Sequence, residues 1–121
     1  MSEQKNALFD LVGDLDLDSL TVIIGEVSDE IKSNANQGAT EQEWRDSQAM
    51  DVAEEAGEFM GAYRRHRGFA RRGADADEVL DELSDVIIAS MIMFRHLDAS
   101  AEYYIRRKLQ KIVTRGWVNK D

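Results

Sequence analysis

The chain has no cysteine and no proline, and it contains only two histidines. Without cysteine the fold has no disulfide, so it needs no oxidising compartment. Without proline, the usual interruption of a helix is missing as well. Metal ions that prefer sulfur and imidazole, such as zinc and iron, would find few ligands here. Any metal site is therefore expected to use oxygen ligands.

Long apolar runs are also missing. The longest nearly apolar segment extends from Val86 to Phe94 with Ser90 as its polar residue, and a membrane helix requires roughly 20 such residues. The first ten residues, MSEQKNALFD, lack the basic region and the long apolar stretch of a secretory signal. We therefore expect a soluble, cytoplasmic protein that has no membrane contact.

The net charge of −9 disfavours binding to a nucleic-acid polymer, because proteins of that class attract the phosphate backbone with a basic surface. The basic residues are nevertheless unevenly spread, with one cluster within 64–72 and another within 106–115. Two local basic clusters on an acidic protein favour a small polyanion as the ligand.

The spacing of apolar residues and of polar caps predicts an all-α fold, a bundle of four helices in one domain. We expect helices from about Ser19 to Asn34, from the capping box Thr40-Glu-Gln-Glu43 to about His66, from the cap Asp75 to about Leu97, and from the cap Ser100 to about Arg115. Residues 1–18 are interpreted as an acidic arm or a short helix, residues 19–117 as the helical domain and residues 118–121 as a tail.

Two of these helices have apolar surfaces that require cover. The first is expected to pack through one face, formed by Leu20, Ile23, Ile24, Val27 and Ile31. The third is apolar almost all round within 86–94, and we expect Ile88, Met91 and Ile92 to point away from the core of their own chain. A protomer of this size can hardly cover them alone, so a homodimer or homotetramer is expected.

The most informative pattern is an acidic stripe that occurs twice. Residues 51–63 and 78–90 align without a gap at an offset of 27 residues, and carboxylates coincide at four places. On two antiparallel helices, the acidic residues beside the apolar stripe would meet at the edge of the core: Glu55, Glu58, Glu82 and Asp85. Four close carboxylates repel one another unless a cation neutralises them. Oxygen ligands alone favour a hard ion, Mg²⁺ or Mn²⁺.

The ordinary explanation for such residues is the solvated face of an amphipathic helix. Two copies in matching positions favour a metal site, because a solvated face has no need of that match. A structural or regulatory helical oligomer without catalysis stays open as an alternative. A carboxylate-bridged di-iron or di-manganese protein usually takes Glu-x-x-His pairs, and both pairs here lack the histidine.

Three cationic residues of the last helix, Lys108, Lys111 and Arg115, recur on one face and can reach a triphosphate together. Their ordinary explanation is favourable placement near a helix C-terminus, worth roughly 0.3–1 kcal/mol per charge. Trp44 at the start of the second helix is suited to stacking on a base or to packing a helix end.

The motif EEAGE at 54–58 is followed after 23 residues by ELSD at 82–85. This order resembles the E-E-x-x-E, spacer, E-x-x-D signature of the MazG-like all-α nucleoside triphosphate pyrophosphohydrolases. Trp44 ahead of the first motif, the apolar run after the second and KLQKIVTRGW at 108–117 occupy comparable places. The resemblance covers roughly residues 19–117.

The resemblance implies Mg²⁺-dependent hydrolysis of a (d)NTP to the monophosphate and pyrophosphate, catalysed by a helical dimer or tetramer. Such a reaction would serve house-cleaning or control of the nucleotide pool. It also implies that the four carboxylates named above hold the metal and that Glu55 is the general base, with Glu54 as a competing candidate. A specialised nucleotide such as phosphoribosyl-ATP is the alternative substrate within the same superfamily. Some pyrimidine-specific relatives carry asparagine four residues after a lysine, where this chain has Ile112, so their base preference is not transferred.

Overall fold

The computed structural model describes residue 3 and residues 16–34 and 38–115. The helices within the described ranges 16–34 and 38–115 are α2 (Leu17–Asn34), α3 (Glu41–His66), α4 (Ala76–His96) and α5 (Ala101–Arg115). No strand occurs within these described ranges, so the predicted all-α class is confirmed. The observed helix limits agree with the predicted limits to within two residues. Most of the predicted arm and the whole of the predicted tail lie outside the described residues.

Polar caps determine where three of the helices begin. The hydroxyl oxygen of Thr40 accepts a hydrogen bond from the amide of Glu43 at 3.1 Å, and the Glu43 carboxylate accepts one from the amide of Thr40 at 3.2 Å, which completes the predicted capping box. The carboxylate of Asp75 and the hydroxyl oxygen of Ser100 each accept from the amide three residues further on. Such caps are typically worth about 1 kcal/mol each, and they fix the register of the acidic stripes.

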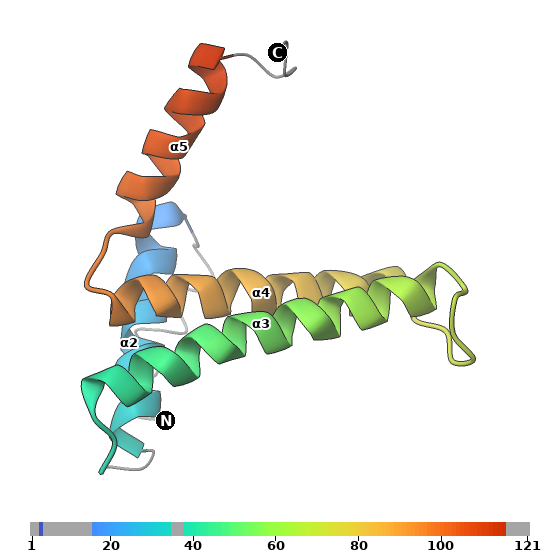
Figure 1. Ribbon diagram of the computed structural model, residues 1–121, viewed down its shortest axis with the longest axis horizontal. Coiled ribbons are helices and arrows are strands. Elements are labelled where there is room, and N and C mark those ends of the chain that lie inside the picture. Colours follow the sequence, from blue (N-terminus) through green and yellow to red (C-terminus); the bar gives the residue numbers. More distant parts are fainter. Residues whose placement is uncertain (1–2, 4–15, 35–37, 116–121) are drawn as a thin grey trace.

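Helices α3 and α4 pack side by side and antiparallel, while α2 crosses α4 near the end of this pair and α5 points away from it (Figure 1). Two long side chains of α3 donate to backbone carbonyls of α4. Gln48 Nε2 lies 3.0 Å from the Ala89 oxygen, and Arg45 Nε lies 2.9 Å from the His96 oxygen. These bonds join the first half of α3 to the second half of α4, so the middle of α3 faces the first half of α4.

The core lies where α2 crosses α4 and α5 begins, and it contains Ile24, Met91, Ile92 and Ala101. The prediction that Met91 and Ile92 point away from their own core is wrong, since each is only 8% exposed within one chain. The physical reason is that α2 lies across α4 and covers them. Ile88 is 40% exposed, as predicted.

The apolar face predicted for the first helix is only partly used. Ile24 is buried and Leu20 packs against the core, but Val27 and Ile31 are exposed. Helix α2 therefore contributes apolar side chains to the core from its first half. In its second half, Ser28 is buried and Asp29 pairs with Arg95 of α4. In the part of the chain that the structure describes, no helix combines the length and the apolar character needed to cross a membrane.

Candidate metal centre

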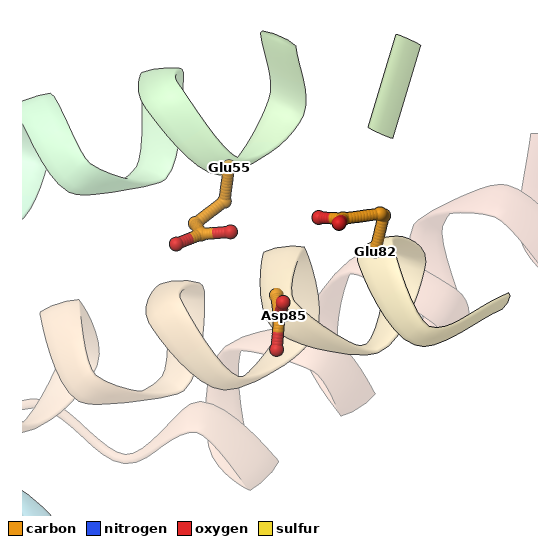
Figure 2. A group of neighbouring side chains, drawn as sticks. All are labelled: Glu55, Glu82 and Asp85. Atoms are coloured by element: carbon orange, nitrogen blue, oxygen red, sulfur yellow. The ribbon is translucent and has the colours of Figure 1, made fainter. Parts of the chain in front are cut away.

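Three carboxylates from two helices converge at the middle of the α3–α4 pair. Figure 2 shows Glu55 of α3 directed toward α4, where Glu82 and Asp85 lie. One carboxylate oxygen from each residue can be chosen so that all three lie within 4.8 Å of one another. Glu82 and Asp85 share a face because they are three residues apart, and antiparallel packing brings Glu55 opposite them. These are three of the four predicted metal ligands.

The burial of these carboxylates indicates that they require a cation. Glu55 and Glu82 are half-buried, whereas Asp85 is exposed. The Oε2 atoms of Glu55 and of Glu82 are shielded from solvent and have no hydrogen-bond partner. A buried carboxylate oxygen without a donor is costly, and one cation between the helices would satisfy both. The oxygen-only ligand set fits a hard divalent ion such as Mg²⁺ or Mn²⁺.

The electrostatics of the centre agree with this interpretation. Burial raises the pKa of the Glu55 carboxyl, and repulsion from Glu58 and Asp85 raises it further. Burial is also the main cause that raises the pKa of Glu82, followed by repulsion from the same two carboxylates, while the Arg65 guanidinium lowers it. Both carboxyls therefore resist ionisation unless a cation is close.

Glu58, the fourth predicted ligand, does not belong to the three-residue group. It is exposed, and with Glu54 and Glu82 it lines a groove of about 520 Å³ beside the centre. Glu58 is nevertheless near enough for its charge to raise the pKa of Glu55 and of Glu82. Glu54, the competing candidate for the base, is exposed at the same groove.

The predicted substrate-binding residues lie apart from the carboxylates. Lys108, Lys111 and Arg115 are exposed on α5, which diverges from the α3–α4 pair, and none of them lines the groove (Figure 1). Within one chain, the structure does not bring this cationic face to the centre.

Trp44 is half-buried and packs against α4. Its ring stacks on His96 of α4, with centroids 6.3 Å apart and 6° between the ring planes. The 11 positions from Trp44 to Glu55 correspond to about 16 Å along a helix. The packing interpretation of Trp44 is therefore favoured over stacking on a base at the metal centre.

One residue at the groove, Arg65, was predicted from the sequence only as part of the basic cluster at 64–72. Arg65 lies near the end of α3, where a basic residue is ordinarily explained by the helix dipole. Its position four residues after Gly61 and seven after Glu58 was the available signal, because that spacing places it on the groove face.

Comparisons of this chain with models of protein families, with curated proteins and with solved structures found no match. Its chemistry has to be argued from the site itself. That site offers a carboxylate centre suited to a divalent cation, a groove beside the centre, and one arginine at that groove.

Proposed function

We propose that the protein is a Mg²⁺-dependent nucleoside triphosphate pyrophosphohydrolase of the MazG-like kind, which cleaves a (d)NTP to the monophosphate and pyrophosphate. The observation that carries the proposal is the three-carboxylate centre between α3 and α4, with two shielded oxygens that have no partner. The motifs EEAGE and ELSD contain all three residues. House-cleaning or control of the nucleotide pool is the role that such an activity would serve.

Glu55, Glu82 and Asp85 would hold the metal, with Glu58 beside them at the groove. When bound, the ion would neutralise phosphate charge and lower the pKa of a bound water. Glu55 is the proposed general base, as the resemblance of EEAGE to the family signature implies. Exposed Glu54 is the competing candidate for that role.

We further propose that the active form is a homodimer or homotetramer. Helix α5 has an exposed apolar stripe at positions i, i+4 and i+8, formed by Ile105, Leu109 and Val113. Exposed apolar patches of this kind mark protein interfaces, and a second copy is the partner we propose for it. Such an assembly would also offer the cations of α5 a route to the centre of another protomer.

Two alternative functions can be tested in the same experiment. A helical structural or regulatory oligomer without catalysis is favoured by the separation between the α5 cations and the carboxylates within one chain. Hydrolysis of phosphoribosyl-ATP would use the same centre, and it differs in the substrate alone.

The deciding experiment incubates the purified chain with a panel of canonical and modified (d)NTPs and with phosphoribosyl-ATP, in Mg²⁺, in Mn²⁺ or in EDTA. Products are resolved by ion-exchange chromatography. We expect equal amounts of monophosphate and pyrophosphate, formed only with a metal. Orthophosphate as the primary product would contradict the proposed cleavage site, and no hydrolysis of any substrate would leave the structural oligomer as the better explanation.

Two matched variants connect this activity to the centre. Glu82→Gln removes a ligand charge without a change of shape, and we expect turnover to fall by more than about 100-fold. Asp81→Asn removes the neighbouring exposed carboxylate, and we expect wild-type turnover. The proposal fails if Glu82→Gln retains normal turnover at saturating Mg²⁺.

A further inference from the structure

The groove beside the carboxylate centre has an unusual lining. One part is acidic, with Glu54, Glu58 and Glu82, and the remainder is formed by Gly57, Gly61 and Arg65. Among the described residues that line it, Arg65 has the one positive charge. The groove therefore joins a cation-binding region to a single fixed cation.

Arg65 is held in place and keeps a donor unused. Its Nη2 donates to the Glu78 carboxylate of α4 at 2.9 Å, and its side chain is 29% exposed. The Nε atom is shielded from solvent and has no hydrogen-bond partner. A shielded N–H without an acceptor is costly, so an acceptor supplied by a ligand would relieve the cost.

The two glycines leave helix backbone as the floor of the groove. A Cβ at Gly57 would meet nothing within 4 Å, and a Cβ at Gly61 would meet only Nη1 of Arg65, at 3.6 Å. Packing inside the chain therefore does not require glycine at either position, although glycine disfavours a helix interior relative to alanine. The contact with Gly61 also shows that the guanidinium reaches back along α3 toward Glu58.

We propose that Arg65 is a phosphate anchor, which binds the phosphates of the substrate that extend from the metal over Gly57 and Gly61. This inference rests on the proposed function. A guanidinium suits phosphate because it offers several donors in one plane. Glu78 fixes the orientation of Arg65, and Arg72, whose Nη2 lies 3.6 Å from the other Glu78 oxygen, helps to neutralise that carboxylate.

The experiment titrates inorganic pyrophosphate into the full chain in the presence of Mg²⁺ by calorimetry, and titrates Mn²⁺ alone in parallel. We expect Arg65→Gln to weaken pyrophosphate binding about tenfold or more, with Mn²⁺ binding unchanged or tighter. Arg65→Lys should recover part of the affinity. In the nucleotide assay, Arg65→Gln should raise KM more than it lowers kcat. Arg64→Gln, at the exposed neighbouring position, is the matched control, and it should bind as wild type.

Glu78→Gln separates the anchor from a structural role, because it breaks the same ion pair. We expect Glu78→Gln, whose amide oxygen can still accept from Arg65, to weaken pyrophosphate binding far less than Arg65→Gln does. If Arg65 serves only to join α3 to α4, both variants lower the melting temperature alike and neither changes pyrophosphate binding, which would overturn the anchor. Should Arg65→Gln fail to fold, Gly57→Ala tests the same groove, and unchanged pyrophosphate affinity in that variant would also overturn it.

The two proposals fail in different ways. Pyrophosphate binding that depends on Arg65, without hydrolysis of any nucleotide in the panel, would support the anchor and overturn the proposed reaction. Normal hydrolysis with unchanged pyrophosphate affinity in Arg65→Gln would overturn the anchor alone. A wild-type chain that binds no pyrophosphate with Mg²⁺ would also overturn the anchor.

Discussion

Replacement of Ile92 by alanine tests whether α2 covers α4 within one chain. The change removes three carbon atoms, and at about 0.8 kcal/mol per buried CH₂ full burial of that many is worth about 2.4 kcal/mol. Ile92 is 8% exposed and lies in the core with Ile24 and Met91, so the variant loses nearly all of this burial free energy. The cavity that the deletion leaves lowers the stability further. We expect the free energy of unfolding to fall by about 3 kcal/mol.

Ile88→Ala is the matched comparison, one turn earlier on the same helix. Ile88 is 40% exposed, so the same deletion should cost about 1.4 kcal/mol in the isolated chain. Urea unfolding is measured at several protein concentrations. The cost of Ile92→Ala should not depend on concentration, whereas the cost of Ile88→Ala should grow with concentration if a second copy covers this surface. Equal costs at the lowest concentration would contradict the packing of α2 on α4.

Two further predictions concern the groove and the centre. The raised pKa values of Glu55 and Glu82 mean that the folded state binds these protons more tightly than the unfolded state, so in EDTA their contribution to stability is full below the unfolded pKa values and is lost as pH rises through the raised values. Melting curves recorded against pH should show this loss, and Mg²⁺ should reverse it. An identical pH profile in the Glu55→Gln/Glu82→Gln double variant would contradict the prediction. Gly57→Ala should stabilise α3 by about 0.5–1 kcal/mol while raising KM, and a lower melting temperature would contradict the open space seen at that position.

The helices could be predicted closely because their signals are local. A capping box at Thr40 and a cap at Asp75 act on amides three residues away, so a single sequence is enough to find them. The cover of Met91 and Ile92 is not local. It depends on where α2 crosses α4, and the apolar face of α2 alone indicated neither the crossing point nor that Val27 and Ile31 would be exposed.

The carboxylate centre was predictable for a related reason. Two matched stripes on helices of similar length need only antiparallel packing to bring Glu55 opposite Glu82 and Asp85. The direction of α5 has no such constraint. It follows from the turn between α4 and α5, where Asp98 has a φ of 52°, and the spacing of Lys108 and Lys111 contains no information about that turn.

The ion pairing of Arg65 bears on what the groove is for. An acidic face that served only solubility would be expected to use a nearby arginine to neutralise its most crowded carboxylates. Here Arg65 donates to Glu78 instead, while the shielded oxygens of Glu55 and Glu82 have no hydrogen-bond partner. The shielded carboxylate oxygens and the unused Nε donor of Arg65 thus lie at or beside one groove. A ligand that brings both a divalent cation and phosphate oxygens complements that arrangement, and a metal–triphosphate complex is such a ligand.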